Sequence, residues 1–338
     1  MTEKKKKRVT IEDVAKDAGV SIATVSRIIN NKDIVNGDTR EKVLSAIEKL
    51  GFVPRSVPVR QDIDRRLILV CMPDFENPFY ARVIRGIRKA ARFHEYDLFF
   101  MQADDFYTRA AVHLRTIKNS GASGVLMVSP ISKKALSELN SICPVVMCSE
   151  YIDDPGFSYV SIDNVMSAKK AVEYLISTGC RRIGLLNSFS RNAYARDREQ
   201  GFDEALQEAG LDISEDRKAH ISAINYQSAF SKAAYLLSME SRPDAIFAAA
   251  DVFAVAAINA AKKLGLRVPD DVSVIGFDNI EASLMCDPQL TTVDQPAEEI
   301  GYQSCELLIE RLLGEDIIPR HIRLETEIIV RQSTKLNK

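Results

Sequence analysis

The residue types that most often carry metal or redox chemistry are sparse in this chain. Six cysteines and four histidines occur in 338 residues, and they include no CxxC pair and no metal-ligand spacing. We expect the thiols to be reduced and mostly buried, as is usual in a reducing compartment. These ten residues therefore predict neither a metal site nor a disulfide framework.

Motifs that bind phosphates or activate a nucleophile are also missing from the sequence. No GxGxxG follows an apolar run, no GxxxxGK[ST] is present, and the GASG at 121–124 leads into an expected strand. No GxSxG surrounds a serine, and no histidine has a recognisable triad context. We therefore predict no cofactor and no enzymatic activity. A sugar or nucleoside enzyme remains an alternative that a turnover assay would reveal.

Charge is distributed unevenly along the chain. Residues 1–60 hold 13 Lys and Arg against 8 Asp and Glu, whereas the whole chain carries a net charge of −2. A basic N-terminal segment on an acidic remainder is typical of nucleic-acid contact confined to one module. A solvated lysine tail is the alternative that charge alone leaves open.

Two short helical patterns follow this basic tail. Thr10 can cap the first, IEDVAKDA, and Ser21 can cap the second, IATVSRIIN. Between them Gly19 can adopt the positive φ of a tight turn.

A third helical pattern, TREKVLSAIEKL, completes this region, with Asp38 placed to cap it and Gly51 to end it. Its apolar stripe consists of Val43, Leu44, Ile47 and Leu50. Three such helices with a tight turn are typical of a helix-turn-helix, whose second helix enters the major groove of DNA. A small protein-binding module is the alternative.

From Leu67 onward, apolar runs of strand length alternate with amphipathic runs of helix length. The strand-like runs are LILVCMP, DLFFMQA, GVLMVSP, PVVMCSE, RIGLLNS, AIFAAA and VSVIGFD. Strands that are apolar on both faces indicate parallel sheets covered by helices on both sides. The pattern repeats after Asp163, so we expect an α/β body of two doubly wound lobes. The cleft at the strand carboxyl ends is the expected ligand site.

The strings VSIATVSRIIN and GDTREKVLSAIEKLGFVP resemble the DNA-binding domain of the LacI/GalR family of bacterial regulators. The resemblance continues over essentially the whole chain, in NPFY at 77–80, VSIDN at 160–164, SVIGFDNI at 273–280 and LTTVDQP at 290–296. It implies three parts: an all-α helix-turn-helix domain over 1–53, a hinge linker over 54–65, and a periplasmic-binding-protein-like domain for ligand binding and dimerisation over 66–338. Lobe one would comprise about 66–163 and 295–324, and lobe two about 164–294 and 325–338.

This resemblance implies a cytoplasmic transcription regulator, expected to be a repressor. A homodimer would bind a pseudo-palindromic double-stranded operator, with a tetramer left open, and a small sugar- or nucleoside-like effector between the lobes would control it allosterically. A solute-binding protein of the same fold is the alternative. The N-terminal module, and the lack of a signal-peptide-like apolar core in MTEKKKKRVT, argue against it. No apolar run approaches the roughly 18 residues that span a bilayer, so no membrane partner is expected.

By the same resemblance, Ile22, Ala23 and Arg27 occupy positions that read DNA bases. Arginine can form two hydrogen bonds with a guanine edge, and isoleucine and alanine can contact a thymine methyl group. The residues expected at the DNA backbone are Thr10, Ser21, Thr24, Ser26 and Asn30.

The linker departs from the family pattern. Many members carry a hinge helix with an Ala-Arg-x-Leu stretch, whose Leu wedges into the minor groove, whereas this chain reads PRSVPVRQDIDRR. No Leu stands at the wedge position, and Pro58 falls where the helix would run. We therefore expect a flexible linker that tolerates variable spacing between operator half-sites.

Three candidate effector residues lie at family ligand positions. Asp278 follows the strand SVIGF and can accept two hydroxyl hydrogen bonds from a polyol or ribose, or can cap the following turn. Arg198 can donate a fork of hydrogen bonds to ligand oxygens, or can form a surface salt bridge. Gln295 carries an amide that both donates and accepts.

Phe79 and Tyr80 follow the first strand, and they can stack on a sugar or base or belong to the core of a helix capped by Asn77. Two further positions depart from the family pattern: Ala250-Asp251 replaces Asn-Asp, and Ser149-Glu150-Tyr151 replaces a stretch containing Asp. Both changes disfavour a simple hexose. The CSEY stretch at 148–151, the string GFDNIEASLMCDPQLTTVDQP at 276–296 and the missing hinge Leu are most similar to the cytidine-responsive branch of the family, in which Glu150 and Tyr151 would hold a base or ribose.

Overall fold

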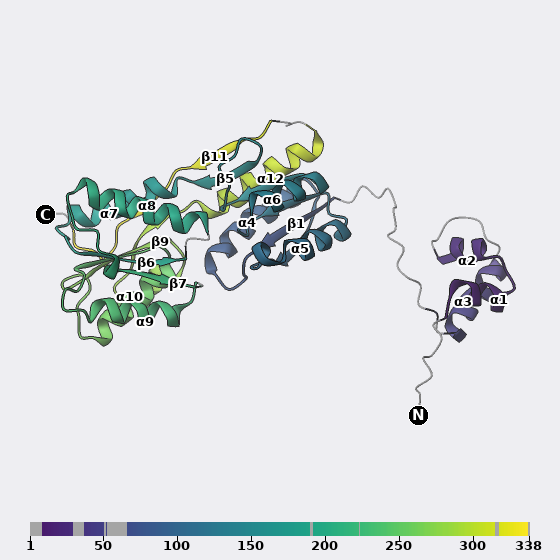
Figure 1. Cartoon of the computed structure of the whole chain (residues 1–338), viewed down its shortest axis with the longest axis horizontal. Helices are drawn as coiled ribbons and strands as arrows, with labels where there is room; N and C mark the ends of the chain where they lie inside the picture. The colour runs from purple at the N-terminus through teal and green to yellow at the C-terminus, as the bar shows by residue number, and fades with distance from the viewer. Residues whose placement is uncertain are drawn as a thin grey trace, which may run out of the picture. The chain divides into compact units, whose positions relative to one another are not determined.

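A computed structural model describes residues 9–29, 37–50, 52, 66–189, 192–222, 224–314 and 318–336. The chain divides into two compact units, residues 1–64 and 65–338, whose elements are labelled in Figure 1. The linker expected over 54–65 lies outside the described residues. Among the helices of the described part, none is both long and apolar enough to cross a membrane.

The first unit contains α1 (Ile11–Ala18), α2 (Ile22–Ile29) and α3 (Gly37–Leu50). Thr10 caps α1 in a capping box with Asp13, and Gly19 ends it with a φ of 67°. The core of the unit consists of Val14, Ala15, Val25, Ile28, Val43 and Ala46. Two predictions are wrong: Asp38 lies inside the first turn of α3 instead of capping it, and Leu44 is 51% exposed.

Two six-stranded sheets form the second unit. The first has the order β11-β5-β4-β3-β1-β2 and the second the order β12-β10-β9-β8-β6-β7. The strands of the first are β1 (Leu67–Met72), β2 (Asp97–Gln102), β3 (Gly124–Met127), β4 (Val145–Cys148), β5 (Ser158–Ile162) and β11 (His321–Leu324). Those of the second are β6 (Ile183–Ser188), β7 (Lys218–Ile221), β8 (Ala245–Ala248), β9 (Ser273–Asp278), β10 (Thr291–Asp294) and β12 (Glu327–Ile329). The pairing is parallel except between β10 and β12, which is antiparallel.

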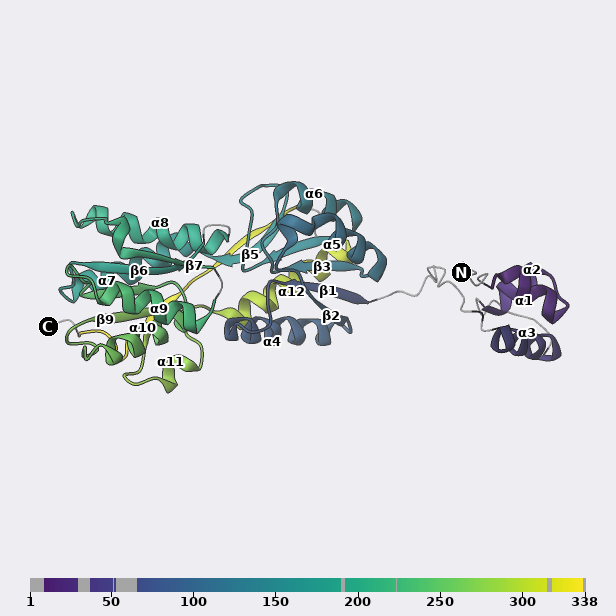
Figure 2. The ribbon, with the colours of Figure 1, turned by 60° about the horizontal axis from the view of Figure 1, so that its bottom comes forward.

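Helices cover both faces of each sheet, as Figures 1 and 2 show. On the first sheet, α4 (Pro78–Phe93) packs against α12 (Ala297–Leu313), and α5 (Phe106–Ser120) against α6 (Lys133–Ile142). On the second, α7 (Asn164–Ser177) packs against α8 (Ala193–Glu208), and α9 (Tyr226–Leu237) against α10 (Asp251–Lys263). Two shorter elements, the 3₁₀ turn η1 (Glu215–Arg217) and α11 (Ala282–Met285), complete the lobe.

The chain passes between the two sheets three times. It leaves the first sheet after β5 and returns to it after β10, where α12 packs on β3, β4 and β5. It leaves again after β11 to add β12 to the second sheet. Three connections between the lobes, at residues 163, 295–296 and 325–326, therefore form one hinge region.

Glycine allows two helix pairs to approach closely. A Cβ atom added to Gly301 of α12 would lie 2.1 Å from the carbonyl oxygen of Val83 in α4. A Cβ atom added to Gly201 of α8 would lie 2.1 Å from the carbonyl oxygen of Val165 in α7. Since real Cβ atoms cannot come so near a carbonyl oxygen, both helix pairs require glycine here.

We predict that Gly201→Ala lowers the free energy of unfolding by about 1 to 3 kcal/mol, because α8 must move away from α7. The neighbouring Gln200→Ala, on the exposed side of the same helix, serves as the control and should change it by no more than about 0.5 kcal/mol. Urea unfolding measures both changes. Equal stability of the two variants would show that the helix contact is not tight.

Candidate functional site

A cavity of about 730 Å³ lies between the two lobes, at the carboxyl ends of their strands. Lobe one contributes residues that follow β1, β2, β3 and β4, and lobe two contributes the end of β6 and residues after β7. The polar and aromatic lining residues are Asp74, Tyr80, Gln102, Asp104, Glu150, Ser188, Phe189, Asn192, Tyr194 and Ser222. The cavity thus has walls from both lobes.

The charged residues of this lining are all acidic. Asp74, Asp104 and Glu150 supply three carboxyl groups, and no Lys, Arg or His belongs to the described lining. Carboxylates accept hydrogen bonds from hydroxyl and amino groups, whereas they repel phosphates. The cavity therefore suits a ligand that is rich in hydrogen-bond donors and carries no negative charge.

Glu150 connects the two lobes at the cavity wall. The residue follows β4 of lobe one and is 6% exposed, and its Oε2 accepts a hydrogen bond from the backbone N–H of Ala193 at 2.9 Å. Ala193 begins α8 of lobe two, so the carboxyl group lies at the N-terminal end of that helix. Burial raises the pKa of Glu150 to about 7, against the opposing effect of the backbone N–H groups of Ala193 and Tyr194.

A smaller cavity of about 300 Å³ also has walls from both lobes. Its lining includes Tyr107, Ile131, Met147, Glu150 and Tyr151 of lobe one with Ala193, Arg196 and Asp197 of lobe two. Tyr151 Oη donates a hydrogen bond to Asp197 Oδ2 at 2.5 Å. Tyr151 therefore makes a second direct link between the lobes.

Arg198, Asp278 and Gln295 form one buried network. Arg198 Nη1 donates to the carbonyl oxygen of Ala249 at 2.6 Å and lies 3.7 Å from Asp278 Oδ1. Gln295 Nε2 donates to the same Asp278 oxygen at 2.5 Å. Burial raises the pKa of Asp278 to about 6, although Arg198 and Gln295 both favour its charged form. The guanidinium also stacks on Phe277, 3.6 Å from the ring centre.

Backbone strain marks the same network. Asp278 has a φ of 114° and the next residue, Asn279, has a φ of 53°. Residues other than glycine rarely adopt such values, and those that do cluster at functional sites. The neighbouring Asp251 is fully buried and holds this turn, since its Oδ2 accepts from the backbone N–H of Ile280 at 2.9 Å and its Oδ1 from Thr292 Oγ1 at 2.6 Å.

The nine candidate effector residues fall into three groups: those that line a cavity, those in the buried network, and those outside both. Tyr80 and Glu150 line the large cavity, and Glu150 and Tyr151 line the small one. Arg198, Asp278 and Gln295 are joined to one another in the buried network, and neither cavity includes them in its lining. The structure thus brings together six of the nine candidates in two neighbouring sets.

The other three candidates lie outside the cavity lining. Phe79 is 5% exposed and belongs to a core cluster, one of the two roles that the sequence left open. Ser149 joins the sheet through its backbone, donating its N–H to Val160 and accepting from Ser161 Oγ. Asp251 supports the turn after β9.

Sequence reasoning missed most of the cavity lining. Asp74, Gln102, Asp104, Ser188 and Ser222 each end a strand or follow it by one or two residues. Applying the carboxyl-end rule to every predicted strand would have found the first four. Asn192 and Tyr194 precede or begin α8, and their position depends on how the lobes pack.

The expected DNA-contacting residues lie around the start of α2. Ile22 is 47% exposed, Ala23 is exposed, and Thr24 and Ser26 are partly exposed. Ser21 Oγ accepts a hydrogen bond from the backbone N–H of Thr24 at 3.1 Å and so caps the helix.

The other residues expected to contact DNA are Thr10, Arg27 and Asn30. Thr10 is exposed, and its side chain caps α1. The side chain of Arg27 and the whole of Asn30 lie outside the described residues.

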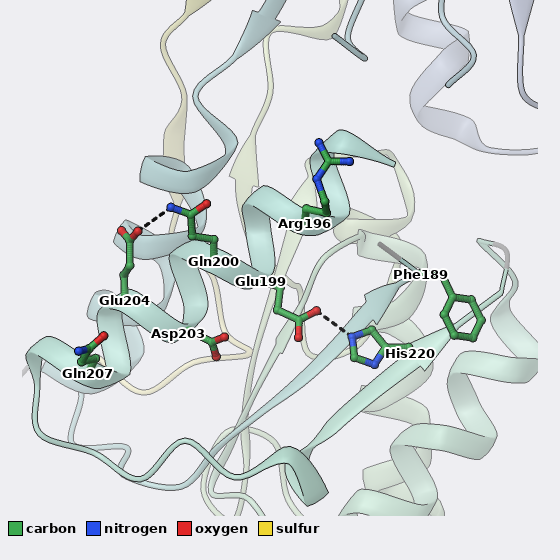
Figure 3. A pocket seen from close by; sticks show the side chains of 8 residues that line it. All are labelled: Phe189, Arg196, Glu199, Gln200, Asp203, Glu204, Gln207 and His220. Atoms are coloured by element: carbon green, nitrogen blue, oxygen red, sulfur yellow. Dashed lines mark hydrogen bonds and ion pairs between the residues drawn. The ribbon is translucent and has the colours of Figure 1, made fainter. Parts of the chain in front are cut away.

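A further cavity of about 630 Å³ lies on lobe two, beside α8 and β7 (Figure 3). His220 is hydrogen-bonded to Glu199 at 2.7 Å, and Lys218 pairs with Glu199, Asp203 and Glu215. Glu199 and Asp203, two carboxylates of the cavity lining, are thus already paired with side chains of the same lobe. This cavity does not connect the lobes and is a weaker candidate for effector binding.

Comparisons with known proteins agree with this architecture. Residues 10–55 match the model of the bacterial regulatory proteins of the lacI family, and residues 172–334 match a periplasmic binding protein-like domain. The HTH-type transcriptional repressor CytR of Escherichia coli strain K12 is 32% identical over 338 residues, covering 98% of each chain. Catabolite control protein A of Priestia megaterium is 33% identical over 333 residues, covering 97% of this chain and 99% of that protein.

This chain belongs to the LacI family of bacterial transcriptional regulators. The solved structure of a transcriptional regulator CelR–cellobiose complex matches 96% of this chain and 100% of its own, with a TM-score of 0.74 and 31% identity. A LacI family regulator from Enterococcus faecium with bound ribose matches 80% of this chain and 99% of its own, with a TM-score of 0.71 and 25% identity. The predicted helix-turn-helix and two-lobed α/β body are confirmed, and so is the function of a DNA-binding regulator controlled by a small effector.

The raised pKa of Glu150 gives the LacI-family regulator a predictable response to pH. Because the pKa of Glu150 in the folded state, about 7, exceeds the ordinary value of 4.5, ionisation of this side chain disfavours the folded state. Protonated Glu150 therefore stabilises the folded state. This stabilisation is complete below about pH 4.5 and is lost as the pH rises through 7.

We predict that Glu150→Gln removes this loss of stability at rising pH, because glutamine does not ionise. Relative to wild type, the variant should gain up to roughly 3 kcal/mol in free energy of unfolding between pH 5 and pH 8. Urea unfolding of both proteins at the two pH values measures the change. A constant difference between the variants across this range would contradict the assignment.

Proposed function

We propose that this regulator is a repressor whose effector is an uncharged, hydroxyl-bearing nucleoside or sugar bound between the two lobes. The observation that carries the proposal is the lining of the large cavity. It combines three carboxyl groups with three aromatic rings, those of Tyr80, Phe189 and Tyr194, and its described part contains no cationic side chain. Carboxylates hold hydroxyl groups, and aromatic rings pack on the apolar face of a sugar or base.

In this proposal Tyr80, Glu150 and Tyr151 contact the effector directly. Arg198, Asp278 and Gln295 lie at the hinge between lobes and contact the effector or fix the hinge once it is bound. Phe79, Ser149 and Asp251 support the walls of the site. The cellobiose and ribose complexes of similar regulators favour a polyhydroxylated ligand. The resemblance of the CSEY stretch at 148–151 to the cytidine-responsive branch of the family favours a nucleoside.

We infer that residues 1–53 bind DNA, 54–65 link the units, and 66–338 bind effector and dimerise. A homodimer places two α2 helices on half-sites about one helical turn apart. Ile22, Ala23 and Arg27 read bases, and the neighbouring Thr10, Ser21, Thr24, Ser26 and Asn30 contact the backbone. Effector and DNA are coupled through their different affinities for two arrangements of the lobes.

A thermal-shift screen tests the effector class. Cytidine, adenosine, ribose, cellobiose and ribose 5-phosphate are compared at equal concentration, since a ligand at 100 times its Kd stabilises the folded state by about 2.7 kcal/mol. We expect at least one uncharged probe to raise Tm and ribose 5-phosphate to have no effect. Phe189→Ala should reduce the shift without changing the fold, because the side chain is 53% exposed. A shift with ribose 5-phosphate alone would overturn the proposed ligand class.

Arg27→Ala tests base reading. Loss of a bidentate contact with guanine should weaken binding to a selected operator by about 10- to 100-fold in Kd, because such a contact contributes about 1 to 3 kcal/mol. Binding to random duplex should weaken much less. Lys49→Ala on α3 is the control, since it removes a charge that pairs with Asp17 on α1. If Arg27→Ala binds the operator as wild type does, this arginine does not read the operator.

A further inference from the structure

Three aromatic rings stack on one another at the edge of the first sheet. His321 of β11 lies opposite Tyr159 of β5 in the parallel register (Figure 1), and their ring centres are 4.3 Å apart at an interplanar angle of 23°. Tyr159 also stacks on Tyr151, with ring centres 4.9 Å apart and an angle of 28°. Aromatic rings at such distances attract one another and prefer defined orientations. The position of the Tyr151 ring therefore depends on β11 as well as on its own loop.

The Tyr151 end of this stack contacts lobe two. Tyr151 Oη donates a hydrogen bond to Asp197 Oδ2 of α8 at 2.5 Å. A hydrogen bond to a carboxylate is strong, but it depends on the direction of the donor. A tyrosine side chain that is free to rotate pays more conformational entropy to form this bond than one whose ring is fixed by its neighbours. Fixing the Tyr151 ring therefore strengthens the contact between the lobes.

His321 also holds the segment that follows Tyr151. Its Nε2 donates to the carbonyl oxygens of Asp154 and Phe157, at 3.2 and 3.0 Å. Both carbonyl groups belong to the connection between β4 and β5, in which Tyr151 lies as well. The imidazole thus contacts the ring stack with its face and the loop with its edge.

Arg323 supports the stack from the same strand. It lies two residues after His321 and therefore on the same side of β11. Its Nε donates to Tyr159 Oη at 3.3 Å, and its guanidinium carbon lies 5.7 Å from the centre of the Tyr151 ring. Since β11 ends at Leu324, the crossing at residues 325–326 follows immediately. The strand that holds the stack leads directly into the hinge region.

The first two rings of the stack lie apart from the ligand-sized spaces. Neither His321 nor Tyr159 belongs to the lining of the three described cavities. Tyr159 is 1% exposed and belongs to a core cluster, whereas the side chain of His321 is 31% exposed. Replacement of His321 can therefore remove one ring of the stack without opening a cavity in the core.

We propose that His321 is a positioning residue for closure of the lobes, which fixes Tyr151 at Asp197 through the ring of Tyr159. The stack then joins the hinge strand β11 to a lobe contact that lies away from the hinge. Effector and operator are bound with different affinities by different lobe arrangements. His321 therefore shifts the balance between these arrangements, and with it the apparent affinity for either ligand, although it contacts neither.

Hydrogen exchange of the full chain, measured by mass spectrometry on peptides that contain residues 193–197, tests this proposal. Amide protons at the start of α8 exchange when this end of the helix loses its contacts with lobe one. His321→Ala should speed their exchange by about 2- to 10-fold, the effect expected for loss of one aromatic contact. Tyr151→Phe keeps the ring but removes the hydroxyl, and should speed exchange at least as much. His321→Phe keeps a ring in the stack and should exchange as wild type does.

His94→Ala is the matched control, because His94 also lies in lobe one but bonds Glu306 of α12. It should leave exchange at 193–197 unchanged. If His321→Ala speeds exchange in β5 and β11 but not at 193–197, His321 only supports its own sheet and the proposal is overturned.

Two further results would also overturn the proposal. Fast exchange at 193–197 in His321→Phe would show that the hydrogen bonds of the imidazole, and not its ring, fix Tyr151. An unchanged rate in Tyr151→Phe would show that the bond to Asp197 does not hold α8. The exchange measurement uses no ligand, so its outcome is separate from that of the effector screen.

Discussion

The three connections between the two sheets are the constraint on which the rest of the body depends. Because the chain crosses after β5, after β10 and after β11, the lobes cannot separate and can move only about a common hinge. Gln295 lies in one crossing and bonds Asp278 at the end of β9. Thr326 lies in another and is hydrogen-bonded to Ser167 of α7. These polar contacts accompany an apolar core cluster that includes residues of both lobes, such as Tyr80 and Ile280.

Contacts away from the hinge determine how far the lobes are closed. Glu150 bonds the first N–H of α8, and Tyr151 bonds Asp197 one turn later, so two adjacent residues of lobe one hold one helix of lobe two. Both residues line the cavities as well. A ligand that contacts Glu150 or Tyr151 therefore acts directly on the lobe contacts, and this is how an effector can favour one lobe arrangement over another.

Much of the fold could be predicted from the sequence because its strongest patterns are local. Seven strands appear as apolar runs, and Thr10 and Gly19 delimit α1 by their intrinsic preferences. The strands β5, β7, β10, β11 and β12 were not predicted, because each carries polar side chains, such as those of Ser158, Lys218 and Arg323, that interrupt an apolar run. Their stability comes from neighbours that are distant in sequence.

The candidate site was predictable only for residues whose role follows from their position at the end of a strand. Asp278 ends β9, and there its Oδ1 accepts a hydrogen bond from Gln295. Its contact with the effector stays a prediction. Asp251 carries the same carboxyl group but supports a turn, a difference that depends on the positions of Ile280 and Thr292 in space. Occupancy of the interlobe cavities should change the affinity of the regulator for DNA. Fluorescence anisotropy of an operator duplex selected from a random pool measures this affinity with and without the uncharged ligand that stabilises the chain. We expect Kd to change by at least about fivefold at ligand saturation; an unchanged Kd with the cavity saturated would show that the two sites are not coupled.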